Sequence, residues 1–287
     1  MRLPPFEIHT PATLDEAGAL MERLGDDAVL YAGGTELLLV MKLGFADHGH
    51  VVDVKGIAEL RRLELDGDEL VIGGCVTHRA IERSPLVRER WPALAAMTAG
   101  VANVRVRGAG TLGGNLAFAD PHSDPATFLL AADARIEVWG PTGARTVPID
   151  GFVLSAYQTA LAPGELITAV RVPPLATGTG VAHQKIAFHE RPAATVTCIV
   201  RAADGVVDDA HIAVGSVGLA PARLRAAEDA LVAGASADEL ERLARDGCDP
   251  TEDANGAVDY KRHLVGVLVR RTAAEALARA GGGDPSG

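Results

Sequence analysis

The sequence predicts an α+β protein built from three lobes. With 287 residues, the chain exceeds the usual size of a single hydrophobic core. Strand signals begin to dominate near Ile57, and a linker containing Gly and Thr follows Pro173-Pro174. We therefore expect an N-terminal lobe over residues 1–57, a strand-rich lobe over 58–176 and a C-terminal α+β lobe over 177–287.

The first lobe is expected to open with a helix and to carry a glycine turn between a strand and a second helix. Thr13 and Glu16 have the spacing of a capping box, and apolar residues recur at helical intervals up to Leu24. The following segment predicts a strand at 29–31, a helix at 37–41 with Thr35 as its N-cap, and a strand at 51–54.

Two hairpins and three helices are expected in the second lobe. Turn residues at Asp66-Gly67 and at 141–143 separate pairs of strand-like segments. The predicted strands are 61–65, 69–72, 135–139, 145–149 and a closing strand at 166–172. The predicted helices are 77–82, 91–98 and one that starts at Asp124, with Pro125 in its first turn.

The third lobe is expected to place helices after a group of strands. The strands are predicted at 181–188, 195–202 and 206–217. Ser236 and Glu239 form a second capping box, and apolar residues between Tyr260 and Leu277 predict a long final helix. The glycine-rich tail at 281–287 is expected to be disordered.

Charge and cysteine content exclude several classes of function. The net charge of −11 argues against a nucleic-acid partner, because a phosphate backbone requires clustered Lys and Arg. We expect a cytoplasmic protein, since no segment has the length and apolarity of a membrane span and the N-terminus lacks a signal-peptide core. Cys75, Cys198 and Cys248 are too few for a four-thiolate iron-sulfur cluster.

Neither a metal site nor a catalytic constellation is recognisable. His48 and His50 flank Gly49, but no third ligand is evident nearby, so a surface loop is the preferred interpretation. No Ser-His-Asp set, paired-carboxylate motif or HExxH motif can be identified. We therefore expect no metal ligands and no catalytic side chains, and any redox chemistry would come from a bound cofactor.

Two glycine turns, far apart in the sequence, are its most informative feature. One reads Ala32-Gly33-Gly34-Thr35-Glu36 and the other Thr111-Leu112-Gly113-Gly114-Asn115. A Gly-Gly pair lets the backbone approach a bulky anion closely and donate N–H groups to it. Two such turns are best explained by one extended ligand, so we expect a dinucleotide that contains a diphosphate.

A Rossmann site is the alternative interpretation of the second turn. Residues 108–113 match Gly-x-Gly-x-x-Gly, and Asp133 follows at the distance of a Rossmann acid. That motif requires a helix directly after the turn, whereas Pro121 and Pro125 are expected to prevent one. Because the surrounding segments are hairpins rather than alternating strands and helices, the Rossmann interpretation is rejected.

The segment Gly110–Asn115, followed by Asp120-Pro121 and Asp124, resembles the flavin-binding subunit of the molybdenum hydroxylases. This family includes the medium chains of carbon monoxide dehydrogenases and the FAD domain of xanthine dehydrogenase. The resemblance covers essentially the whole chain, including residues 162–167 and Lys185. It implies FAD as the cofactor, and a two-subdomain FAD-binding unit of the PCMH type followed by a C-terminal α+β domain.

The resemblance also implies which residues bind the cofactor. Both glycine turns resemble segments that hold the FAD diphosphate through backbone N–H groups. Asp124 resembles the acid that reaches the adenosine part of FAD, and it is equally suited to cap the helix that follows. Val101 and Leu161 match positions that line the flavin, although core packing alone would explain them. Lys185 resembles a lysine near the isoalloxazine ring, and its structural alternative is a solvated strand lysine.

One position departs from the family pattern. Many relatives carry an Asp-Tyr or similar pair beyond this lysine, and the aromatic ring covers the flavin, but this chain has Pro192-Ala193. Either Phe188 or His189 takes over the shielding, or one flavin face is left open to an acceptor.

The function implied by the resemblance is that of the FAD subunit of a heterotrimeric molybdenum hydroxylase. Electrons would come from a [2Fe-2S] small subunit, a large subunit would carry the molybdenum cofactor, and an external acceptor would take the electrons from FAD. The complex would be a dimer of heterotrimers. Two alternatives stay open: a stand-alone FAD-dependent oxidoreductase of the same fold, and an assembly or scaffold protein that has lost the cofactor.

Overall fold

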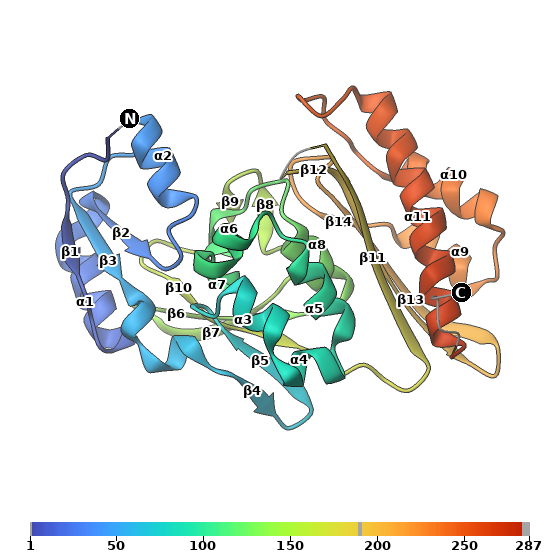
Figure 1. The fold of residues 1–287 in the computed structure, drawn as a ribbon, viewed down its shortest axis with the longest axis horizontal. Coiled ribbons are helices and arrows are strands. Elements are labelled where there is room, and N and C mark those ends of the chain that lie inside the picture. Colours follow the sequence, from blue (N-terminus) through green and yellow to red (C-terminus); the bar gives the residue numbers. More distant parts are fainter. Residues whose placement is uncertain (1, 189–190, 283–287) are drawn as a thin grey trace.

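The structure, a computed structural model, describes residues 2–188 and 191–282. Within these residues, sheets of three, five and four strands follow one another along the molecule, with helices on their faces (Figure 1). A short two-stranded ladder accompanies the five-stranded sheet. The combination of parallel and antiparallel sheets with separate groups of helices confirms the predicted α+β class.

The first sheet is parallel and has the strand order β1-β3-β2. Its strands are β1 (Glu7–His9), β2 (Ala28–Tyr31) and β3 (His50–Asp53). The sequence predicted β2 and β3 but not β1, because three residues carry too little alternation to be recognised. Two short 3-10 turns, Val54–Gly56 and Ala58–Arg61, lead from this sheet to the next.

The first helix, α1 (Leu14–Leu24), begins as the capping box predicts. The Thr13 hydroxyl accepts a hydrogen bond from the Glu16 amide at 3.1 Å. The Glu16 carboxylate accepts one in return from the Ala12 amide at 2.7 Å. The helix ends at Gly25, where a 3-10 turn, Gly25–Asp27, leads directly into β2.

The second helix, α2 (Leu37–Leu43), starts differently from the prediction. Thr35 is not its N-cap; that position belongs to Glu36, whose side chain makes no capping hydrogen bond. The reason is that helical hydrogen bonding already begins in the glycine turn, where the Leu38 amide donates to the Gly34 carbonyl at 3.1 Å.

The second sheet contains both predicted hairpins and the predicted closing strand. Its order is β4-β5-β10-β6-β7, and all its pairs are antiparallel. The closing strand lies in the centre, since Val170 pairs with Ile72 on one side and with Ile136 on the other. The strands are β4 (Leu63–Asp66), β5 (Glu69–Gly73), β6 (Arg135–Gly140), β7 (Gly143–Pro148) and β10 (Leu166–Val172).

A group of short helices packs between the second and third sheets (Figure 1). The sequence predicted α3 (His78–Arg83), α5 (Pro92–Ala99) and α8 (Asp124–Ala131). It missed α4 (Pro85–Arg90) and α6 (Val104–Ala109), and also the ladder of β8 (Val153–Ser155) with β9 (Gln158–Thr159). All of these missed elements are too short to show a full apolar period.

The segment after the second glycine turn corrects a prediction. A helix, α7 (Leu112–Phe118), follows Thr111 directly, although the prolines were expected to prevent one. The helix ends at Ala119, whose φ of 50° is left-handed, so Pro121 lies beyond its end and cannot interrupt it. The N-cap of α8 is also Ser123 rather than Asp124, which is the first residue of that helix.

The third sheet is antiparallel, with the order β11-β12-β13-β14; the C-terminal helices cover one face and the short helices of the middle region pack against the other (Figure 1). Of the predicted second capping box only the N-cap half forms: Ser236 Oγ accepts from the Glu239 amide at 3.2 Å, whereas the Glu239 carboxylate pairs with Arg242. The two C-terminal tail residues that are described form a turn; 283–287 lie outside the described residues. The elements are β11 (Thr179–Ala187), β12 (Pro192–Ala203), β13 (Val206–Gly215), β14 (Ala222–Arg223), α9 (Arg225–Val232), α10 (Ala237–Gly247) and α11 (Val258–Ala280).

The buried apolar side chains form three clusters, one for each sheet. Leu166 of β10 belongs to the cluster of the first sheet, so the first and second sheets share packing. Among the described residues, no helix combines the length and the apolarity needed to cross a membrane.

Candidate functional site

The two glycine turns touch each other in the folded chain. A Cβ atom on Gly33 would meet the Ala109 carbonyl oxygen, and would lie 2.7 Å from Cα of Gly110 and 3.0 Å from the Thr111 amide nitrogen. These contacts are with backbone, which cannot move aside as a flexible side chain can. The first turn therefore approaches the second as closely as only glycine allows.

Gly34 is required for a different reason. Its φ is +68°, in the left-handed region, and a Cβ there would overlap the Tyr31 ring. The turn between β2 and α2 therefore requires glycine at this position. In the described part of the chain, the backbone amides of residues 33–36 donate to no protein acceptor. A row of unused amides at a tight turn is a site for an anion.

The second turn is anchored within the protein instead. The Thr111 hydroxyl caps α7, and three successive amides are already used: Leu112 donates to Val76 O (3.0 Å), Gly113 to Gly74 O (3.1 Å) and Gly114 to Thr111 Oγ1 (3.1 Å). The two turns thus differ, although the sequence suggested the same role for both. The second turn supplies a small, rigid surface against which the first can pack.

A cavity of about 340 Å³ lies where the turns meet. Its wall also includes residues from the second sheet and from the start of β12, so it reaches from the first lobe to the third. Most of the predicted cofactor-binding residues line it: Ala32, Gly33, Gly34, Thr35, Glu36, Val101, Thr111, Gly113, Gly114, Asn115, Asp124 and Leu161.

Two predicted residues do not line the cavity. Leu112 is 1% exposed and belongs to the hydrophobic core of the second lobe. Lys185 lies behind the wall: its Nζ donates to Asp124 Oδ2 at 2.5 Å and to the Gly100 carbonyl at 2.7 Å. Lys185 therefore neutralises a cavity-lining carboxylate from β11, rather than forming part of the cavity wall.

Asp124 is the buried acid of the site. It is 4% exposed, and burial raises its pKa above the ordinary value while Lys185 opposes that rise. One oxygen is held by Lys185, but Oδ1 has no hydrogen-bond partner among the described residues. A buried acceptor without a donor is costly, so the cavity is suited to a ligand that brings a hydroxyl or amino group to this point.

Sequence reasoning missed the charged group near the first turn. Arg191 lines the cavity and joins two lobes, since its guanidinium lies 3.3 Å from the Glu36 carboxylate and 2.9 Å from that of Asp120. A single arginine before a strand carries no sequence signal for such a role. His122 also contacts both Asp120 and Asp253, and these contacts raise its pKa despite its partial burial.

Pro192 and Ala193, which stand where many relatives carry a polar-aromatic pair, lie in different environments. Pro192 lines the cavity, whereas Ala193 is fully buried in the core of the third lobe. Phe188 is 54% exposed and is not part of the cavity wall, so the structure gives it no shielding position. The other residue considered for shielding, His189, lies outside the described residues.

His78 is a further cavity residue that the sequence did not reveal. It is 2% exposed, its Nδ1 has no hydrogen-bond partner among the described residues, and its amide donates to Gly110 of the second turn. Burial, with a smaller contribution from Arg107, lowers its pKa to about 4. The ring is therefore neutral at pH 7 and offers either an acceptor or a donor to a ligand.

Stability between pH 7 and pH 5 is expected to depend on His78. Below pH 6.5 the unfolded chain binds a proton at this ring, whereas the folded chain binds it only near pH 4. The unfolding free energy therefore falls on acidification, by about 2 kcal/mol from this residue. Urea unfolding at pH 7 and at pH 5 measures this effect. On acidification, the unfolding free energy of His78→Gln should fall by about 2 kcal/mol less than that of the wild type. Equal losses of unfolding free energy in the two proteins would contradict the lowered pKa of His78.

Comparisons with known families and curated relatives cover nearly the whole chain. The family described as the FAD binding domain in molybdopterin dehydrogenase matches residues 4–175, and the CO dehydrogenase flavoprotein C-terminal domain matches 187–276. The carbon monoxide dehydrogenase medium chain of Hydrogenophaga pseudoflava is 38% identical, over 96% of this chain and 98% of the relative. The nicotine 6-hydroxylase medium subunit of Paenarthrobacter nicotinovorans is 33% identical, over 97% of this chain and 100% of the relative.

Solved structures show the same fold. Carbon monoxide dehydrogenase from Hydrogenophaga pseudoflava, in a form that lacks the Mo-pyranopterin moiety, matches with a TM-score of 0.94, covering 97% of this chain and 99% of that one at 38% identity. Quinoline 2-oxidoreductase from Pseudomonas putida 86 matches with a TM-score of 0.92. The match covers 98% of this chain and 99% of that one, at 27% identity. The chain therefore belongs to the family of FAD-binding medium subunits of the molybdenum hydroxylases.

Proposed function

We propose that this chain is the FAD-carrying electron-transfer subunit of a heterotrimeric molybdenum hydroxylase. The observation that carries the proposal is the meeting of two glycine turns at one cavity, with unused amides on one side and the unpartnered Asp124 Oδ1 on the other. These features fit FAD, whose diphosphate is an anion and whose adenosine carries hydroxyl and amino groups. Family membership over nearly the full length supports the same assignment.

The residues have distinct roles in this proposal. The amides of residues 33–36 would hold the diphosphate, and Asp124 Oδ1 would accept a hydrogen bond from the adenosine part. Val101 and Leu161 would give the cavity apolar walls. Lys185 favours the ionised form of Asp124 and fixes one of its oxygens, so it would act on the cofactor through that carboxylate.

FAD, when bound, supplies the redox chemistry, and the chain positions it and sets the surrounding charge. The three cysteines are free thiols, and burial raises the pKa of Cys75 to about 11 and of Cys198 to about 12. Three thiols are also too few to hold an iron-sulfur cluster, which takes four thiolates. A [2Fe-2S] cluster would therefore lie on a small partner subunit and the molybdenum cofactor on a large one.

The relatives support a carrier role rather than a role in substrate recognition. Their names refer to carbon monoxide, nicotine and caffeine, yet the matched subunits all align with this chain over at least 96% of its length. One electron carrier serves different reactions most simply when the substrate pocket lies on another subunit. The proposal further includes a dimer of heterotrimers, an external acceptor, a cytoplasmic location and the division into 1–57, 58–176 and 177–287.

The purified full-length chain is expected to retain one FAD, or to take it up when FAD is added. The measurement is the absorbance of the flavin bands after gel filtration, compared with the protein concentration. A folded chain that stays colourless after loading would refute the proposal and favour a cofactor-less scaffold. Purification from the native source distinguishes the remaining alternative, because a stand-alone oxidoreductase would carry no iron-sulfur or molybdenum-containing partner.

A further inference from the structure

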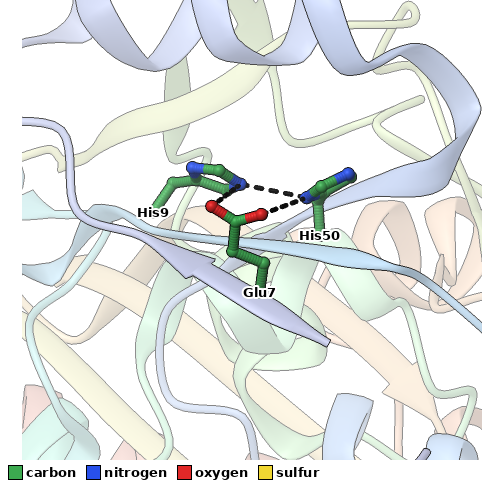
Figure 2. A group of neighbouring side chains, drawn as sticks. All are labelled: Glu7, His9 and His50. Atoms are coloured by element: carbon green, nitrogen blue, oxygen red, sulfur yellow. Dashed lines mark hydrogen bonds and ion pairs between the residues drawn. The ribbon is translucent and has the colours of Figure 1, made fainter. Parts of the chain in front are cut away.

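Three polar side chains from two neighbouring strands of the first sheet gather in one place. Glu7 and His9 belong to β1, and His50 belongs to β3 (Figure 2). Residues two apart on a strand face the same side, and Glu7 is the register partner of His50 in the parallel pair. The fold thus forms a cluster of two imidazoles and one carboxylate, which we call the His9–His50 cluster.

The distances in the cluster match a metal coordination sphere. His9 Nε2 lies 3.1 Å from His50 Nδ1, while Glu7 Oε1 lies 4.0 Å from His9 Nε2 and Glu7 Oε2 lies 3.7 Å from His50 Nδ1. In a tetrahedral zinc site with bonds near 2.0 to 2.1 Å, neighbouring ligand atoms are about 3.3 Å apart. The two imidazole nitrogens are already at that separation, and the exposed glutamate needs only a small side-chain adjustment.

Asp27 lies on the far side of one of the two imidazoles. Its Oδ1 is fixed by the Gly49 amide at 2.7 Å, and its Oδ2 lies 3.9 Å from His50 Nε2. The negative charge favours a proton on Nε2, which leaves the lone pair of His50 on Nδ1, facing His9 and Glu7. A carboxylate behind a ligating histidine is the usual outer partner in zinc sites.

We propose that the His9–His50 cluster binds a divalent zinc-type cation. Two imidazoles and a carboxylate suit Zn²⁺, whereas Ca²⁺ and Mg²⁺ prefer oxygen ligands alone. The side chain of Glu7 is 67% exposed, compared with 15% for His9 and 27% for His50, so solvent reaches the fourth position. The sequence pointed to His48 and His50 without a third ligand; the fold instead pairs His50 with residues of β1.

The cation would act as a structural link. β1 has only three residues, and the ligands would join it to β3, while Asp27 stands immediately before β2. Strand β2 leads directly into the first glycine turn. Bound zinc is therefore expected to raise the melting temperature of the chain, because a ligand that binds only the folded state stabilises it.

Titration of the metal-free full-length chain with zinc chloride, followed by calorimetry, tests the proposal. One zinc ion per chain is expected, with the affinity reduced roughly 100-fold or more in His9→Ala and His50→Ala and about 10-fold in Asp27→Asn. The control is His263→Ala, which removes an exposed histidine of α11 and should leave zinc binding unchanged. Circular dichroism and FAD retention establish that each variant is folded, independently of the zinc result.

Two results would overturn the proposal. One is a wild-type chain that binds no zinc under these conditions, which would leave the cluster as a cross-strand hydrogen-bonded pair. The other is zinc binding that His9→Ala and His50→Ala do not weaken, which would place the ion elsewhere. Neither outcome concerns FAD, so the proposed electron-transfer function stands or falls separately.

Discussion

Gly33→Val is expected to weaken FAD binding by at least about 100-fold, which corresponds to about 2.7 kcal/mol. The added side chain would begin at a Cβ that meets the Ala109 carbonyl and lies 2.7 Å from Gly110 Cα. The two glycine turns would have to separate, and overpacking of this kind typically costs 1 to about 3 kcal/mol. Because φ of Gly33 is not in the left-handed region, the effect is purely steric.

The measurement is FAD content after gel filtration, together with a titration of the cofactor-free chain with FAD. Gly108→Ala is the matched control, since a Cβ on Gly108 has open space within 4 Å and its φ is also not positive. That variant changes a glycine next to the same turn and should bind FAD as the wild type does. Normal FAD affinity in Gly33→Val would show that the cofactor does not depend on the contact between the turns.

Lys185→Met is expected to lower the unfolding free energy by about 3 kcal/mol, because it leaves the Asp124 carboxylate buried without a countercharge. The two groups join α8 to β11, and the Lys185 ammonium also donates to the Gly100 carbonyl at 2.7 Å. Removal of both charges is much less harmful than removal of one. The double variant Asp124→Asn/Lys185→Met should therefore be more stable than Lys185→Met alone.

Urea unfolding of the cofactor-free variants measures both effects, so that FAD binding does not contribute. Lys42→Met serves as the control, since Lys42 is exposed on α2 and its replacement should change stability by less than about 0.5 kcal/mol. If Lys185→Met were as stable as Lys42→Met, the pair with Asp124 would have no structural importance. Additive effects in the double variant would likewise contradict a direct coupling.

Most regular elements could be predicted, because their signals are local. The long strands and α11 show clear apolar periods, and Thr13 and Ser236 cap the helices that the sequence assigned to them. The errors concern short elements. Helix α7 was rejected because Pro121 follows it closely, but a left-handed Ala119 ends the helix before the proline. A prediction from proline alone could not include the conformation of that residue.

The sequence by itself determined the α+β class, the two glycine turns and the residues of the family motif. These features depend on local composition and spacing, which determine turns, caps and apolar periods. Most of the residues that the family resemblance assigned to the cofactor also line the cavity.

Only the tertiary structure decided which groups meet. The contact of Gly33 with residues 109–111, the pairing of Lys185 with Asp124, and the place of Arg191 beside Glu36 all join segments far apart in the sequence. The same holds for His9 and His50, which lie 41 residues apart and meet on neighbouring strands. Such contacts follow from strand order and packing between lobes, and no local pattern of residues records them.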